Sequence, residues 1–124
     1  MTNVKNRARE AHRQSVEFTI GDIARFLQDT LGQSLTAHMA GVSNPKNVSL
    51  WAKAETTPRA KAEQRLRTAF QVFHMLQEEE TPHTVRAWFI GLNPQLDEES
   101  PADAIRNDRL KDVLVAAKAY ISGG

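Results

Sequence analysis

The sequence predicts an all-α fold, an N-terminal helix-turn-helix-like bundle that is continuous with a small C-terminal helical domain. Apolar residues recur at steps of three and four, no segment alternates like a strand, and short polar residues followed by proline mark repeated helix starts. With 124 residues, 40% of them hydrophobic and 25% charged, the chain is globular and forms one domain or two small units that share a core.

The chain begins with a basic segment. Residues 1–13 hold four bases against one acid and lack an apolar stretch, so they resemble neither a secretory signal nor a membrane anchor. We expect residues 1–15 to form a flexible basic arm. Apolar residues at helical spacing then predict a helix over 18–31, which ends at Gly32.

Two short helices follow in the sequence. Ser34 is expected to cap a helix that Gly41 stops, and Asn47 to cap the next one, which carries Val48 and Trp51. Pro45 between them keeps Asn44 out of helical geometry and predicts a turn. Together with the preceding helix, these elements make residues 16–64 a helix-turn-helix-like region.

Three further helix starts share a hydroxyl residue followed by proline. Thr57 and Pro58 begin a helix of about 20 residues, Thr81 and Pro82 begin one that runs through Leu92, and Ser100 and Pro101 begin the last helical segment, through Ile121. In each start the hydroxyl can accept a hydrogen bond from a free amide of the first turn. Residues 65–124 form the second predicted unit.

The segment from 35 to 53 resembles a helix-turn-helix. A small residue, Ala37, stands where two helices would cross closely, and Gly41 follows where the turn needs positive φ. Gly41 and Val48 are seven residues apart instead of the usual six, which would re-aim the second helix of the pair. Residue types that reach phosphates and base edges would form its outward face. These candidate DNA-binding residues are Ser43, Asn44, Lys46, Asn47, Ser49 and Lys53. The alternative is a helix-turn-helix kept for packing only.

The C-terminal part resembles the toxin-binding domain of the Xre/MbcA/ParS antitoxins. The resemblance rests on Trp88, the Asn-Pro-Gln-Leu loop at 93–96, the Ser-Pro-Ala-Asp helix start at 100–103, and Gly123, in that order. Arg86 stands before Ala87 and departs from the pattern. Members of this family also carry a helix-turn-helix ahead of the domain, and residues 33–55 match it more loosely.

The resemblance implies a partner, a RES-domain toxin that consumes NAD, whose active-site entrance the C-terminal helices would cover. It also implies an antitoxin that is not an enzyme and that can repress its own operon by binding operator DNA. The candidate toxin-binding residues are Trp88, Phe89, Asn93, Asp97, Arg106, Arg109, Tyr120, Gly123 and Gly124. The alternative function is a helix-turn-helix transcription regulator without a toxin partner.

Two further expectations concern particular residues of that set. The segment Tyr120–Gly124 ends in two glycines and could enter a pocket built for NAD, with Arg106 and the acidic loop 97–99 near its rim; a frayed terminus is the alternative. Trp88 and Phe89 point about 100° apart, so one can fill the core while the other reaches an edge. For Trp88, core packing alone is the competing interpretation.

Composition limits the other classes of function. The sequence has no cysteine and no histidine pair at metal-ligand spacing, so we expect no metal site, no cofactor and no catalytic residues. A net charge of +1 favours neither nucleic acid nor membrane by itself, although 46–67 holds six bases against two acids and 68–100 one base against six acids. We expect a cytoplasmic protein. The number of apolar residues on short helices predicts a homodimer, or a higher hetero-oligomer with the toxin.

Overall fold

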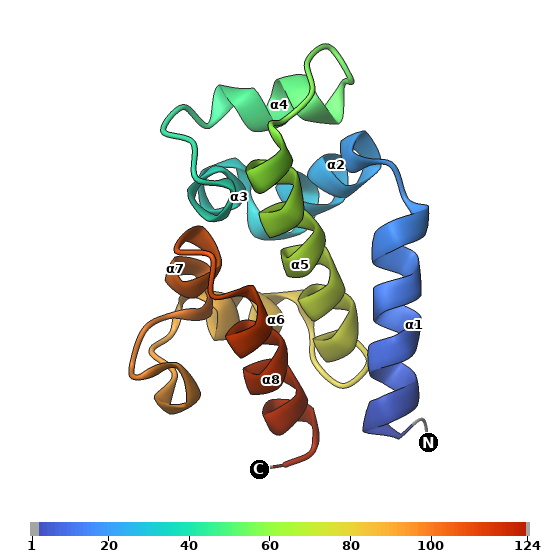
Figure 1. Cartoon of the computed structure of the whole chain (residues 1–124), viewed down its shortest axis with the longest axis vertical. Coiled ribbons are helices and arrows are strands. Elements are labelled where there is room, and N and C mark those ends of the chain that lie inside the picture. Colours follow the sequence, from blue (N-terminus) through green and yellow to red (C-terminus); the bar gives the residue numbers. More distant parts are fainter. Residues whose placement is uncertain (1–2, 124) are drawn as a thin grey trace.

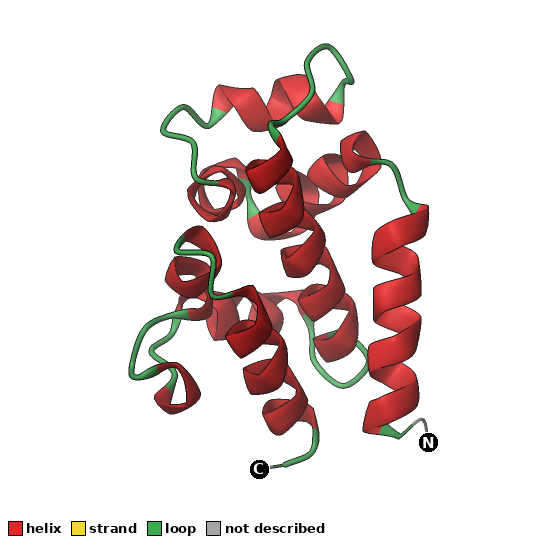
Figure 2. Cartoon of the chain, in the orientation of Figure 1, coloured by secondary structure: helices red, strands yellow, loops and turns green. Residues whose placement is uncertain are grey.

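The computed structural model describes residues 3–123, and these form helices joined by short turns, with no strand among them (Figure 2). The all-α prediction is therefore confirmed. The helices are α1 (Val4–Glu17), α2 (Ile20–Leu31), α3 (Gln33–Ala40), α4 (Lys46–Ala52), α5 (Ala60–Leu76), α6 (Pro82–Ile90), the short 3₁₀ helix η1 (Pro94–Leu96), α7 (Pro101–Arg106) and α8 (Leu110–Ile121). None of these helices is long and apolar enough to cross a membrane.

The long helix α5 lies at the centre of the molecule. It packs against α1, α2, α3, α7 and α8, with α4 at one end of the structure and the C-terminal helices at the other (Figure 1). The apolar residues predicted to face inward on it, from Ala62 to Leu76, are all buried. The division predicted between residues 64 and 65 falls inside α5, and one hydrophobic cluster contains residues from both sides of it.

The expectation of a flexible arm over residues 1–15 is wrong for the residues that the structure describes, because Val4–Glu17 is a helix packed on α5. Met1 and Thr2 lie outside those residues. Arg7 is buried, and it forms ion pairs of 2.8 Å with Glu78 and 3.1 Å with Glu79. The acids that follow α5 therefore neutralise a cation that the sequence alone assigns to solvent.

Several predicted helix ends are confirmed. The side chains of Thr81 and Ser100 accept hydrogen bonds from backbone amides three residues on, each with proline at the first helical position. Gly41 ends α3 in the left-handed conformation. Other starts differ from the prediction, since Ser34 lies inside α3 and α5 begins after Arg59 instead of Thr57.

Two further differences come from hydrogen bonds near helix ends. The start of α4 uses Asn44, whose side chain accepts from the Lys46 amide, in place of Asn47. The segment from Pro101 to Ile121 is broken between α7 and α8 at Asp108, which has φ of +64°. Arg65 donates two hydrogen bonds, of 2.9 and 3.0 Å, to the Asp108 carboxylate and so holds the break in place. The hydrogen bond from Arg65 lowers the pKa of Asp108.

The C-terminal end of α3 is held by two arginines from other elements. Arg65 on α5 donates to the Ala40 carbonyl at 2.9 Å, and Arg106 on α7 donates to the His38 carbonyl at 2.7 Å. Cations beside the last carbonyls of a helix satisfy orphan acceptors and favour the negative end of the helix dipole. These two contacts join the helix-turn-helix-like region to the C-terminal helices.

His74 is the histidine whose titration should affect stability. Its ring stacks on Phe26 at 5.1 Å and meets the edge of Phe70 at 4.3 Å, and its Nε2 atom is buried without a partner among the described residues. Burial lowers the pKa of His74 below its ordinary value of 6.5. The unfolded chain therefore takes up this proton first as the pH falls.

We expect the free energy of unfolding to be constant, as far as His74 is concerned, above about pH 7 and to fall as the pH drops below about 6.5. Urea unfolding followed by circular dichroism at pH 7.5, 6.5 and 5.5 measures this. His74→Gln should flatten the profile. An unaltered profile in His74→Gln would contradict the assignment.

Candidate partner-binding groove

A groove between α6, the loop that follows it and α8 collects much of the exposed apolar surface. We call it the α6–α8 groove; its volume is about 400 Å³. It is lined by Trp88, Leu92, Asn93, Pro94, Ala116 and Tyr120, among others. Leu92 is 75% exposed and Tyr120 is 41% exposed. Apolar side chains gathered in one place at the surface indicate a contact site.

The two aromatic residues of α6 have different positions. Phe89 is completely buried, whereas Trp88 is half-buried and stands with its ring centroid 6.3 Å from that of Tyr120 on α8. The expectation that one of the pair fills the core and the other reaches an edge agrees with these positions. Phe89 lies in the core with its whole side chain buried, and it does not line the groove. Its assignment as a toxin-binding residue stays a prediction.

The loop after α6 is held rigidly by its own backbone. The Asn93 side-chain oxygen accepts a hydrogen bond from the Gln95 amide at 2.9 Å. The backbone carbonyl of Asn93 accepts from the amides of Leu96 and Glu98. Asp97 and Glu98 then take positive φ, of 57° and 67°. Asn93 thereby fixes the edge of the α6–α8 groove, which gives this predicted site residue a structural role at the site.

The acidic loop is partly neutralised from inside the molecule. Arg109 forms ion pairs with Asp97 at 3.3 Å, Glu99 at 3.2 Å and Asp112 at 3.1 Å, and it also donates to the Leu96 carbonyl. These carboxylates raise the pKa of Arg109, and the hydrogen bond that Arg109 donates to Asp112 contributes most. Arg109 and Asp97 therefore stabilise the loop, and a partner would have to compete for them.

Arg106, at the end of α7, contacts another helix of the same chain. Its guanidinium reaches back to the His38 carbonyl on α3, beside the 2.6 Å contact between His38 and Asp103. Arg106 precedes α8 and Tyr120 is close to its end, and about 15 Å of helix lies between Leu110 and Tyr120. The expectation that Arg106 lies near the rim of a toxin pocket entered by residues 120–124 stays a prediction.

The end of α8 is attached to the rest of the structure at Tyr120. The Tyr120 hydroxyl donates to Glu80 at 2.8 Å, and this hydrogen bond, with burial second, raises the pKa of Tyr120. Helix α8 continues to Ile121, which packs on the core, and Gly123 is exposed with φ of +78°. Gly124 lies outside the described residues.

The candidate DNA-binding residues lie together at the far end of the molecule, on α4 and the turn before it (Figure 1). Ser43, Asn44, Lys46 and Lys53 are exposed, and Asn47 and Ser49 are half-buried, while Val48 and Trp51 face the core as predicted. The basic residues of α1 lie along a different part of the structure. Arg7, one of them, is buried in its ion pairs.

The apolar residues that suggested a dimer are mostly covered within one chain. Trp51, Phe70 and Phe73 are buried, Phe26 and Leu50 are half-buried, and Phe18 is 44% exposed.

The sequence did not predict Leu92 and Ala116 as residues of the groove. Leu92 follows Gly91, where α6 ends, so helical periodicity assigns it to no face.

The lining of the groove is mainly apolar. No group of three or more histidines, cysteines or carboxylates that could hold a metal ion exists within residues 3–123. The groove presents aromatic and aliphatic surface with an amide at its edge, which suits a protein contact. In comparisons with known proteins, no protein-family model, no curated protein and no solved structure matches this chain.

Proposed function

We propose that this chain is an antitoxin, a protein-binding module without catalytic activity of its own, which holds a RES-domain toxin at the α6–α8 groove. One observation carries the proposal. Trp88 and the first three residues of the Asn-Pro-Gln-Leu motif, on which the resemblance to antitoxins rests, line the same groove where Leu92 and Tyr120 expose apolar surface.

Neutralisation in this proposal is steric. A toxin surface beside the active-site entrance would cover Trp88, Leu92 and Tyr120, and the bulk of the helical domain would then keep NAD out. Large aromatic residues in a desolvated patch carry most of the energy of such interfaces. The rigid loop at Asn93 keeps the patch in its bound shape, so little ordering opposes association.

The test is a co-expression experiment in which this chain is produced together with a RES-domain toxin. Leu92→Asp places a charge in the patch at a position that is 75% exposed, so the fold should tolerate it. We expect the inhibition constant for the toxin's NAD consumption to rise at least about 10-fold and growth rescue to be lost. Val16→Asp, at a valine that is 64% exposed on α1, is the matched control and should inhibit like the parent chain.

The same experiment separates the two functions under consideration. A helix-turn-helix regulator without a toxin partner would bind operator DNA through the exposed side of α4, and neither variant would change toxin activity because the parent chain would not inhibit it. Full inhibition by Leu92→Asp would instead show that the α6–α8 groove does not take part in the contact with the toxin. The proposal also includes two further interactions of the same antitoxin, which are binding to operator DNA and formation of a homodimer.

A further inference from the structure

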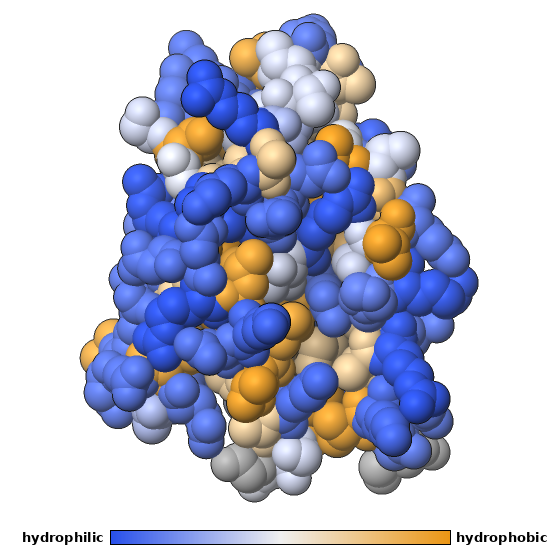
Figure 3. Space-filling view, in the orientation of Figure 1, coloured by the Kyte–Doolittle hydropathy of each residue, from blue (hydrophilic) through white to orange (hydrophobic). Residues whose placement is uncertain are grey.

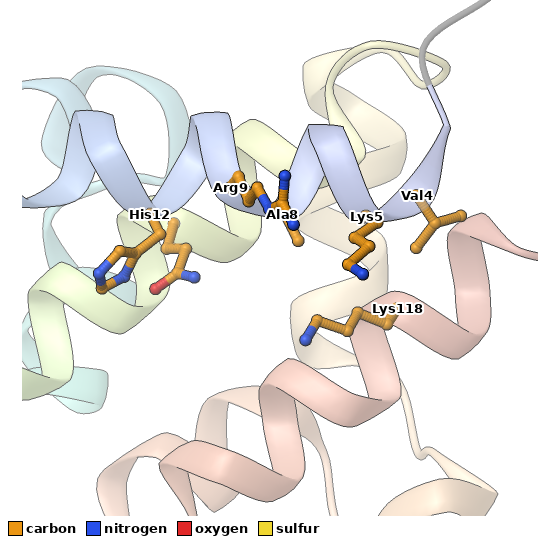
Figure 4. Close-up of a pocket in the computed structure, with 7 residues that line it drawn as sticks. Val4, Lys5, Ala8, Arg9, His12 and Lys118 are labelled. Carbon is orange, nitrogen blue, oxygen red and sulfur yellow. The ribbon is translucent and has the colours of Figure 1, made fainter.

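A second groove lies on the other side of α8, between α8 and α1. We call it the basic groove; its volume is about 590 Å³, and its residues include Val4, Lys5, Ala8, Arg9, His12 and Lys118. Lys5 extends from α1 toward α8, where Lys118 lies (Figure 4). In the space-filling view, hydrophobic surface is exposed between α8 and α1 in the lower half, among hydrophilic residues (Figure 3).

The cations of this groove are not neutralised by the chain itself. Within residues 3–123, Lys5, Arg9 and Lys118 form no ion pair. The other bases of α1 are paired, since Arg7 contacts Glu78 and Glu79 and Arg13 contacts Glu10 and Glu17. The basic groove therefore keeps its positive charge for something outside the chain.

The spacing of the groove residues suits a helix as the ligand. Lys5, Arg9 and His12 recur at steps of four and three on α1, so they form a row along one wall at intervals of about one helical turn. Carboxylates at the same steps on a second helix would meet that row. Val4 and Ala8 supply apolar contact between the charged residues.

We propose that the basic groove binds an acidic amphipathic helix of a partner protein. Such a helix would lay its apolar stripe on Val4 and Ala8 and its glutamates or aspartates against Lys5, Arg9 and Lys118. A nucleic-acid backbone would satisfy the cations but has nothing apolar to cover the valine and alanine. Charge complementarity and the apolar contact together select the acidic helix.

This site is independent of the α6–α8 groove. Lys118 and Tyr120 are two positions apart on α8, which places them about 200° apart around the helix, on opposite sides. The basic groove goes beyond the proposed function, and a failure at either groove leaves the other untouched. Leu92→Asp should bind the acidic helix like the parent chain.

The experiment uses nuclear magnetic resonance of the ¹⁵N-labelled full chain. The probe is a capped synthetic peptide of about 16 residues, with leucines at helical spacing and glutamates on both sides of the stripe. We expect it to shift the amides of residues 4–12 and those around Lys118. Lys5→Gln with Lys118→Gln should weaken binding about 3- to 10-fold, whereas Lys46→Gln with Lys53→Gln, two exposed lysines on and beside α4, should not.

Three results would overturn the proposal. The first is the absence of any shift at the groove on addition of the peptide. The second is equal binding of a scrambled peptide with the same composition but no helical stripe, because charge alone would then explain the contact. The third is a short DNA duplex that perturbs the same amides more strongly than the peptide, which would assign the groove to nucleic acid.

Discussion

Phe89→Ala is expected to lower the free energy of unfolding by about 3–5 kcal/mol, the largest effect of any substitution considered for this chain. The Phe89 side chain has no exposed surface, and its ring meets that of Trp88 edge to face at 5.5 Å. Alanine would leave a cavity that α6 cannot close, because Arg86 holds this helix to the Leu31 carbonyl and Thr81 caps its start. Urea unfolding at pH 7.5 measures the loss.

Trp88→Ala is the matched comparison on the same helix. Trp88 is half-buried and borders the α6–α8 groove, so its removal should cost less stability and should act mainly on partner binding. A stability loss for Trp88→Ala that equals the loss for Phe89→Ala would show that both rings support the core. The interpretation of Trp88 as a contact residue would then fail.

Gly41→Ala is expected to have the second largest effect. Gly41 has φ of +89°, which a side chain adopts at a cost of about 1–3 kcal/mol. A Cβ atom there would also stand 2.5 Å from the Arg65 Nη1 atom. Arg65 would have to move away from the Ala40 carbonyl, at a further cost of about 1 kcal/mol for the lost hydrogen bond.

The same substitution made beside Arg65→Ala separates these two contributions. The three heavy atoms nearest to a Cβ at position 41 all belong to the Arg65 side chain, so Arg65→Ala removes them and leaves only the cost of the backbone conformation. Chemical denaturation should therefore show a smaller loss for Gly41→Ala in the Arg65→Ala chain than in the parent chain. If the two losses are equal, backbone conformation accounts for the whole effect, and the Arg65 contact contributes nothing.

The sequence predicted the helix starts that depend on a hydrogen bond within the first turn. Thr81 and Ser100 are short polar residues before proline, and each caps its helix because the acceptor and the free amide lie in the same turn. The helix α1 could not be predicted in this way. Its stability depends on Arg7 meeting Glu78, 71 positions away, and no periodicity in residues 1–15 indicates that contact.

The candidate site was predictable in part for a similar reason. The sequence placed Trp88 and Asn93 in a segment of unusual composition, and both border the groove. It assigned Arg106 and Arg109 to a partner contact because of the resemblance to antitoxins. In this fold their guanidinium groups bond the backbone carbonyls of His38 and Leu96. Such contacts cannot be predicted from the sequence, because every residue has a backbone carbonyl.

The arginines at the end of α3 determine how this protein can change by recombination. A chimera joined at residue 64 would place the guanidinium groups of Arg65 and Arg106 against the end of a foreign helix, and its last carbonyls would have to lie where those of His38 and Ala40 lie. The residues before and after position 64 therefore do not form two units that can be exchanged independently. A chimera that keeps both contacts must carry α3 together with α5 and α7.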